Sequence, residues 1–264
     1  MRTLLCIFLL GLTLARGAQP PELVDALKGL RELRSYSWEI INGDPGPVAQ
    51  RSETRRGTVT TVQQNLSPHV KGSLTTNGEM LIERDWPDGL RMDTFVSADG
   101  ATVTRTPEGW MNAQEVLEAI AEERSIGSTS SERYRWLRRA DRPDLRRPDQ
   151  ELAPFFKGLG AFEASGDSYT ARFRTRLDGT VITDDDDSQA AINVTITLNI
   201  RRGTLRDYEI KIEGSQAVGR LGVQLPVNDD RLVIISYLPV MRLDVPDEAR
   251  AKLKSLRSAG SQRN

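Results

Sequence analysis

The chain has 264 residues, and its 36 basic and 37 acidic side chains leave a formal net charge of −1. A near-neutral chain with interleaved signs lacks the basic surface that nucleic-acid binding requires, so we expect no nucleic-acid partner. At this length the chain can bury an apolar core of its own.

Residues 1–17 have the pattern of a secretory signal peptide. Arg2 precedes an apolar run from Leu4 to Leu14, and the small residues Ala15 and Gly17 suit cleavage after Gly17. The run is too short to span a bilayer, which takes about 20 residues. Cys6, the only cysteine, lies inside the run and not at the cleavage point, so no lipid anchor is expected.

Cleavage would leave one cysteine-free domain over residues 18–264, without an integral membrane segment. A secreted eukaryotic domain commonly depends on disulfides, whereas this one has to depend on its core. We therefore predict a bacterial protein that is periplasmic or secreted.

The mature chain is expected to open with an amphipathic helix after Pro20 and Pro21. Its apolar face repeats at helical spacing and consists of Leu23, Ala26, Leu27, Leu30 and Leu33. Residues 35–41 then turn strand-like, with Tyr36, Trp38 and Ile40 on one side. The helix is expected to pack on a sheet, because it lacks the basic face of a membrane-surface helix.

Residues 51–110 repeat a hairpin pattern. The expected strands cover 58–63, 70–76, 79–84, 90–97 and 101–105, with a further strand near Trp110. Asn77-Gly78 and Asp99-Gly100 are typical of tight turns between strands. Because no strand–loop–helix pattern surrounds the glycines, no phosphate-binding loop is predicted.

Two helices are expected next, over 113–123 and 132–139. Asn112 and Glu115 have the spacing of a capping box, and Val116, Leu117 and Ile120 would face the core.

Seven arginines lie in the second of these helices and the loop after it: Arg133, Arg135, Arg138, Arg139, Arg142, Arg146 and Arg147. Together with Tyr134 and Trp136 they suggest an anionic polymer as ligand. Asp141 and Asp144 among them favour a salt-bridged connector instead. An anionic head group or a partner protein is the alternative.

A further helix is expected from Pro148, carrying Leu152, Phe155, Phe156 and Leu159, with Pro154 as a possible kink. The strand that follows places Tyr169, Ala171, Phe173 and Leu177 on one face. Its other face carries Arg172, Arg174 and Arg176, most simply as the solvated side of the sheet and alternatively as a partner surface. Asp184–Asp187 lack the glycine and distal glutamate of a calcium loop, so we expect a solvated hairpin tip and no metal.

The segment from Ala190 to Pro246 is predicted to be an antiparallel meander. Its clearest strand alternates Ile192, Val194, Ile196, Leu198 and Ile200 with polar residues. Three more runs follow at 205–213, 218–225 and 232–238. Gly214, Pro226 and the acidic turn at 228–230 are expected to separate them.

Residues for catalysis are few. His69 is the only histidine, which excludes sites built from several histidines, and no nucleophile elbow occurs. We expect no enzyme activity and no cofactor.

The two ends of the expected domain carry a family resemblance. The helix running into SYSWEI, over Leu23–Ile41, and the closing LDVPDEARAKL, over Leu243–Leu253, resemble the bacterial outer-membrane lipoprotein carrier superfamily and related secreted bacterial proteins. The resemblance implies an incomplete antiparallel barrel closed by helices around an apolar cavity for acyl chains. No binding motif of that family matches residue by residue.

The fold class is accordingly predicted as α+β, a curved antiparallel sheet of about ten strands forming an incomplete β-barrel with helices packed on its concave face. The leading function is non-enzymatic binding of a lipid or acylated partner between sheet and helices. The candidate cavity residues are Trp38, Ile192, Val194, Ile196 and Leu198, with Phe155 and Phe156 as a lid. The alternative is a ligand-free interaction module that uses the arginine-rich surfaces.

Overall fold

The computed structural model describes most of the chain after the expected signal peptide. The described residues are 19–43, 47–54, 57–64, 67–141, 145–156, 162–175, 181–182, 192–218 and 223–261. The predicted signal peptide, the Asp184–Asp187 run and Arg176 lie outside these ranges.

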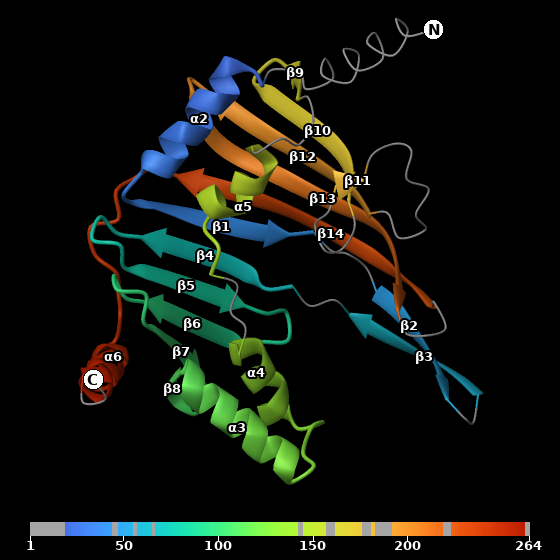
Figure 1. Cartoon of the computed structure of the whole chain (residues 1–264), viewed down its shortest axis with the longest axis vertical. Coiled ribbons are helices and arrows are strands. Elements are labelled where there is room, and N and C mark those ends of the chain that lie inside the picture. Colours follow the sequence, from blue (N-terminus) through green and yellow to red (C-terminus); the bar gives the residue numbers. More distant parts are fainter. Residues whose placement is uncertain are drawn as a thin grey trace, which may run out of the picture. The chain divides into compact units, whose positions relative to one another are not determined.

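The described residues form five helices (Figure 1). They are α2 (Pro21–Glu32), α3 (Ala113–Ser125), α4 (Glu132–Asp141), α5 (Pro148–Phe156) and α6 (Asp247–Ser261). The strands before α3 are β1 (Tyr36–Asn42), β2 (Pro47–Thr54), β3 (Gly57–Gln64), β4 (His69–Leu74), β5 (Met80–Asp85), β6 (Arg91–Val96), β7 (Thr102–Thr106) and β8 (Gly109–Asn112). The later strands are β9 (Glu163–Ser165), β10 (Ser168–Thr175), β11 (Val181–Ile182), β12 (Ile192–Arg201), β13 (Thr204–Val218) and β14 (Val223–Ser236).

The fold is α+β with one large antiparallel sheet that does not close into a barrel, which confirms the predicted class. The strand order along the sheet is β11-β10-β12-β13-β14-β1-β4-β5-β6-β7-β8, and β9 pairs with β10 beside this path. A separate sheet consists of β2 and β3. The sequence did not predict β2, β9 or β11.

The chain divides into two compact units, which we describe separately. Unit 1 comprises residues 1–32, 41–65 and 148–234, and therefore holds α2, α5 and β9 to β13 with most of β14. Unit 2 comprises residues 33–40, 66–147 and 235–264, and holds most of β1, β4 to β8, α3, α4 and α6.

In unit 1, β12, β13 and β14 form a meander of long strands. The prediction of four separate runs here is wrong, because β13 and β14 pair along twelve consecutive positions, from Asp207↔Ile234 to Val218↔Val223. Gly214 and Pro226 therefore lie inside strands. Proline lacks an N–H and is tolerated in a strand at an edge. The segment after β1 reaches β14 at Asp230, whose carbonyl accepts a hydrogen bond from Gly43 N–H (2.6 Å). Pro226 lies four residues along β14 from that bond.

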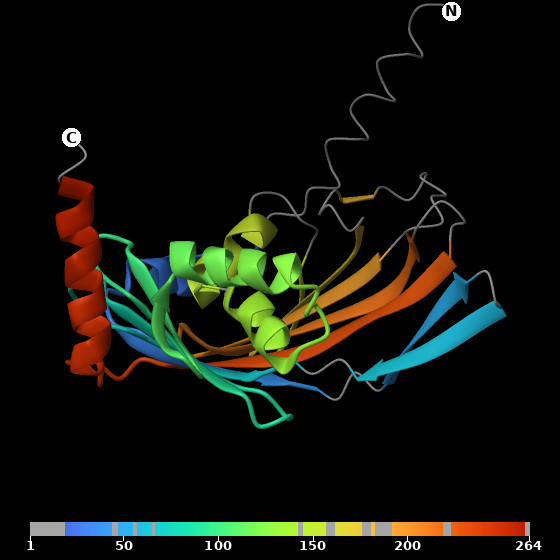
Figure 2. The same cartoon turned by 90° about the horizontal axis from the view of Figure 1, so that it is seen from below.

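In unit 2, the hairpins predicted between residues 70 and 112 are confirmed as β4 to β8. Their glycines have positive φ at Gly78, Gly89, Gly100 and Gly109, which a tight turn demands. The strands lie between α6 on one side and α3 with α4 on the other (Figure 2). This follows from strand alternation, since Met92 packs with α3 and α4 while Phe95, three residues on, packs with α6.

The capping box of α3 is present as predicted, because Asn112 Oδ1 accepts from Glu115 N–H (3.0 Å) and Asn112 N–H donates to Glu115 Oε2 (2.9 Å). The helix buries Val116, Ala119 and Ile120. The prediction that Leu117 faces the core is wrong, because its side chain is half exposed; the buried stripe of α3 continues through Glu123 instead.

Candidate ligand-binding face

One face of the unit 1 strands carries cross-strand rows of mostly apolar side chains. Directly paired residues of antiparallel strands project to the same side. The registers align Tyr169, Leu198, Tyr208 and Val233 in one row, Ala171, Ile196, Ile210 and Arg231 in the next, and Phe173, Val194, Ile212 and Asp229 in a third. The first row is buried throughout.

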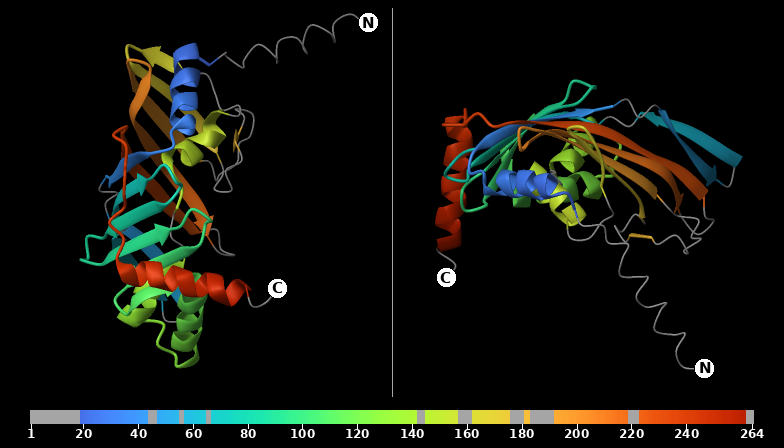
Figure 3. Two further views of the ribbon diagram at one scale, coloured as in Figure 1. Left: turned by 90° about the vertical axis from the view of Figure 1, so that its left-hand side faces the viewer. Right: turned by 90° about the horizontal axis from the view of Figure 1, so that it is seen from above.

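Helix α2 covers part of this sheet. Its stripe of Leu23, Ala26, Leu27 and Leu30 is buried, and the helix packs against β13 and α5. Figure 3 shows α2 and α5 side by side on the same side of the strands. Full burial of one leucine side chain contributes about 2 kcal/mol, so the stripe is enough to hold the helix.

A hydroxyl from the first row is bonded to α2. Tyr169 Oη donates to Glu22 Oε2 (2.6 Å). This bond, together with burial and the charge of the glutamate, raises the pKa of Tyr169. Its phenol is therefore neutral over the physiological range and stays a donor.

The second tyrosine of the row is bonded to α5 in the same manner. Tyr208 Oη donates to Glu151 Oε2 (2.6 Å), and Arg231 Nη2 donates to Glu151 Oε1 (2.5 Å). The Glu151 side chain is only 9% exposed, so it needs both donors to offset the loss of hydration. These residues fix α5 to β13 and β14.

A hollow of about 600 Å³ runs along the flank of α2. The described part of its wall consists of Gln19, Val24, Leu27, Lys28, Arg31 and Glu32. Positions 24, 28 and 31 follow helical spacing and form a stripe beside the buried one, and the buried Leu27 lies at the border between the two stripes. Val24 is 44% exposed in this hollow, and the two cations lie toward the C-terminal end of the stripe.

The seven predicted cavity residues are only partly brought together. Ile192, Val194, Ile196 and Leu198 are buried on β12 in unit 1, whereas Trp38 belongs to unit 2. Phe155 and Phe156 lie at the end of α5, and their side chains are outside the described part of the structure. The described walls of the two hollows in this subsection include none of Trp38, Ile192, Val194, Ile196 and Leu198, so the lining role of the seven residues stays a prediction.

Trp38 packs inside unit 2. Its indole lies over Gly72 of β4 and tilts against Tyr36, with 5.5 Å between the ring centroids. A Cβ at position 72 would lie 2.0 Å from Trp38 Cε2. A glycine inside a strand often marks such a close approach, so Gly72 signals a close contact in the sequence but does not identify Trp38 as the partner.

One of the two described arginines of β10 pairs with a carboxylate of the same sheet. Arg172 is exposed and pairs with Glu163 (3.2 Å), and Arg174 is half-buried. Arg176, the third residue proposed for a partner surface, lies outside the described residues.

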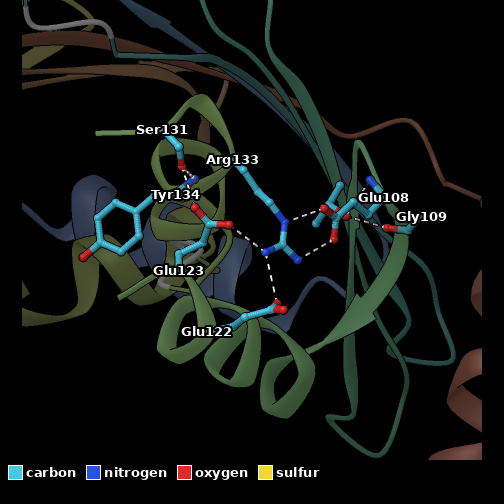
Figure 4. A network of polar contacts seen from close by, with 8 residues as sticks. Glu108, Gly109, Glu122, Glu123, Ser131, Arg133 and Tyr134 are labelled. Atoms are coloured by element: carbon cyan, nitrogen blue, oxygen red, sulfur yellow. Dashed lines mark hydrogen bonds and ion pairs between the residues drawn. The ribbon is translucent and has the colours of Figure 1, made fainter. Parts of the chain in front are cut away.

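The arginine-rich connector is salt-bridged, as expected, and its centre is Arg133 (Figure 4). Its guanidinium donates to Glu108 Oε1 (2.5 Å), Glu123 Oε1 (2.8 Å) and Glu122 Oε2 (3.2 Å). Ser131 Oγ also donates to Glu123 Oε2 (2.7 Å). The network ties the turn before β8 to α3 and α4.

The charges of this network hold both carboxyls ionised. The bonds from Arg133 and Ser131 lower the pKa of Glu123, and the bond from Arg133 lowers the pKa of Glu108. The same carboxylates raise the pKa of Arg133. Arg133 is thus one of three arginines of this region with an assigned carboxylate, since Arg138 pairs with Asp141 (3.1 Å) and Arg139 with Asp88 (2.8 Å). Arg142 is outside the described residues.

A second hollow, of about 370 Å³, lies beside α4 in unit 2. Its wall consists of Asp88, Gly89, Leu90, Glu132, Arg135, Trp136 and Arg139. Arg139 stacks over the Trp86 ring at 5.1 Å from its centroid. The charges of this wall balance, since Asp88 and Glu132 oppose the two arginines.

Little in the described chain points to catalysis or metal binding. His69 Nε2 lies 2.7 Å from Glu39 Oε1, and both side chains are partly exposed. No group of three or more potential metal ligands occurs among the described residues. None of the described helices combines the length and the apolar composition needed to cross a bilayer.

Comparisons with family models, with curated proteins and with solved structures gave no match. The resemblance to lipoprotein carriers therefore stays a prediction that rests on the two short segments at the ends of the domain.

Proposed function

We propose that this protein is a non-enzymatic, periplasmic or secreted bacterial protein that binds the acyl chain of a lipid or of an acylated partner along α2. The observation that carries the proposal is the hollow of about 600 Å³ on the flank of that helix. Its volume is within the range of small-molecule sites, about 300–1,000 Å³.

The composition of the wall favours an amphiphile. Val24 and Leu27 give the hollow an apolar surface, and at one end Lys28 and Arg31 outweigh Glu32, which lies 4.0 Å from Lys28 Nζ, by one positive charge. An acyl chain can cover the apolar part while an acidic head group pairs with the cations, whose alkyl stems extend the apolar wall.

The sheet has a supporting role in this proposal. The buried rows under α2 and the Tyr169–Glu22 bond keep the helix in one position. The Tyr208–Glu151 bond fixes α5, against which α2 packs. A preformed wall binds more tightly than one that must be ordered on binding. The partner-surface alternative is less favoured, because Arg133, Arg138, Arg139 and Arg172 already pair with carboxylates of the same chain.

Titration with a fluorescent octadecanoic acid derivative tests the site. Val24→Asp places a carboxylate on the apolar wall, and we expect affinity to fall about tenfold or more, because the acyl chain loses its contact with valine and binding would have to desolvate the carboxylate. Leu117→Asp is the matched control, because Leu117 is an equally exposed apolar residue on α3. Equal affinity of Val24→Asp and wild type would exclude this hollow.

Native mass spectrometry of protein purified from its host's periplasm tests whether a ligand is carried at all. We expect a lipid-sized mass above that of the polypeptide, removed by organic extraction and absent from Val24→Asp. A bare polypeptide mass from the native source would argue for the ligand-free module instead.

A further inference from the structure

In unit 1, the first half of β14 is paired along one edge only. The neighbours of β14 in the large sheet are β13 and β1, and β1 ends at Asn42. Residues 223–229 therefore pair with β13 alone among the described strands. β2 follows β1 in the chain and belongs to unit 1 as well, but it pairs with β3 in a sheet of two strands (Figure 1). The second edge of β14 is thus left free where β2 would have continued the pairing of β1.

The register at the end of β1 shows what continued pairing with β14 would require. Gly43 N–H donates to the Asp230 carbonyl, so these two residues face each other across antiparallel backbones. In an antiparallel ladder, hydrogen-bonded pairs recur at every second residue. Continued without a shift, this register would pair residue 45 with 228, residue 47 with 226 and residue 49 with 224.

Prolines occupy three of the four positions in the first two of these pairs. They are Pro45, Pro47 and Pro226, and the fourth position is Asn228. Pro47 and Pro226 would face each other, so their pair could form no hydrogen bond, because proline has no backbone N–H. Pro45 falls between the described ranges, and its place in the sequence removes a third donor. Asn228 would supply the single N–H of the two pairs.

The N–H that Pro226 lacks would lie on the free edge of β14. β13 and β14 pair without a shift from Asp207↔Ile234 to Val218↔Val223, so the backbone groups of β14 alternate regularly between its two edges. Asp230 presents its carbonyl to Gly43, and Pro226, four positions along the strand, presents its backbone to the same side. Proline within a sheet is confined to such an edge.

We propose that Pro45, Pro47 and Pro226 form a proline block that keeps the β2–β3 hairpin off the free edge of β14, so that the hairpin is a separate arm of unit 1. Natural sheets use proline on an edge to prevent pairing with a further strand. The hairpin has a complete ladder of its own, from Pro47↔Gln64 to Thr54↔Gly57. The proline block acts through the backbone alone and is independent of the acyl-chain site beside α2.

Disulfide trapping tests the proline block. Continued pairing would place residues 48 and 225 directly opposite each other, at a separation that a disulfide can bridge. In a Cys6→Ser chain, which has no other cysteine, Val48→Cys/Leu225→Cys should stay reduced under mild oxidation. With Pro45→Thr/Pro47→Thr/Pro226→Thr added, the disulfide should form at least about tenfold faster, because three hydrogen-bond donors are restored.

Two further cysteine pairs serve as controls. Ala49→Cys/Val62→Cys joins residues that face each other within the hairpin, so it should cross-link with or without the prolines and shows that the hairpin is folded in both chains. Val48→Cys/Gln224→Cys is one residue out of register. Its two side chains would project from opposite faces of the sheet, so this pair should stay reduced in both chains.

Hydrogen exchange of the edge amides gives a second measurement. The N–H groups of Gln224 and Asn228 lie on the free edge, and they should exchange at least about tenfold more slowly when the three prolines are replaced by threonine. Pro239→Thr is the matched control, because Pro239 is exposed and lies outside the strands, and it should leave both rates unchanged.

Equal rates of Val48→Cys/Leu225→Cys cross-linking with and without the prolines would overturn the proposal. So would unchanged exchange of Gln224 and Asn228 in a threonine variant whose hairpin control still cross-links.

Discussion

In unit 1, α2 and α5 are bonded to the strands through the hydroxyls of Tyr169 and Tyr208, which donate to glutamates of the helices. In unit 2, the helices are bonded through cations: Arg133 joins the turn before β8 to α3, and Lys252 of α6 donates to Glu115 of α3. Each tyrosine hydroxyl joins one helix to one strand of an apolar layer. Arg133 of α4 instead joins the turn before β8 and α3 at the same time.

The two units also differ in how completely the strands are covered. In unit 2, α3 with α4 and α6 bury side chains on opposite faces of the same strands. In unit 1, the packed stripe of α2 leaves a second stripe beside it open to the hollow. The open stripe of α2 is the reason why the proposed binding site lies in unit 1.

The packed core of unit 2 can be tested at its tightest contact. Gly72→Ala places a methyl group inside the space of the Trp38 ring, and we expect a loss of about 3 kcal/mol in the free energy of unfolding by urea. Gly29→Ala on α2 is the control, because nothing lies within 4 Å of its Cβ position. It should stabilise by up to about 1 kcal/mol through helix propensity.

An unchanged stability of Gly72→Ala would mean that the Trp38 indole moves aside at little cost. A mobile indole would strengthen the prediction that Trp38 lines a cavity. The measurement therefore distinguishes a Trp38 that is packed in the core from a Trp38 that lines a cavity.

The tyrosine bonds of unit 1 should differ in strength. Tyr208→Phe removes a donor from the buried carboxylate of Glu151, and we expect a loss of about 1.5–3 kcal/mol in the free energy of unfolding. Tyr169→Phe should cost less than about 1 kcal/mol, because Glu22 is exposed and water can replace the donor. Equal losses for the two variants would contradict the difference in burial.

Tyr134→Phe is the matched control in unit 2. Its hydroxyl accepts only from the exposed Arg124 Nε (3.3 Å), so its removal should leave the unfolding midpoint unchanged.

Local patterns in the sequence were enough to predict much of the fold. Alternation along Ile192–Ile200, the glycine turns of unit 2 and the capping box at Asn112 each depend on residues close in the chain, and each is confirmed. The break expected at Pro226 is wrong, because pairing with β13 across twelve positions outweighs the local preference of one proline.

Contacts between distant residues escaped the sequence analysis. Nothing local pairs Tyr208 with Glu151, 57 positions apart, or places Trp38 over Gly72. The half-exposed Leu117 shows the same limit, since the spacing on α3 fits two neighbouring stripes and only packing against α4 selects one. The hollow beside α2 was missed because Val24 was not assigned to any face.

The cation network of unit 2 should show as a dependence on pH. The pKa values of Glu108 and Glu123 are lowered in the folded protein, so these carboxylates stabilise it above their ordinary value of 4.5. That stability is lost as pH falls below 4.5 through the lowered values. Arg133→Gln should therefore be less stable than wild type at neutral pH, and the difference should narrow at about pH 3.5.

Urea unfolding at the two pH values measures this difference. Solvent screens the partly exposed Glu108 and Glu122, so we expect an effect smaller than that of Tyr208→Phe. Arg206→Gln is the control, because Arg206 is exposed and makes no ion pair with a described residue. A difference between Arg133→Gln and wild type that stays constant with pH would show that the arginine acts by packing alone.

The smallest effect on the free energy of unfolding is expected for a substitution in the arginine row of β10. This row lies on the face of the unit 1 sheet opposite the apolar rows. Arg172 and Glu163 have side chains that are 66% and 78% exposed, so Arg172→Ala should change the free energy of unfolding by less than about 0.5 kcal/mol. A larger loss would show that this face is packed. If stability is unchanged, any loss of partner binding by the same variant can be assigned to the surface itself, because the apolar rows and the helix bonds lie on the opposite face.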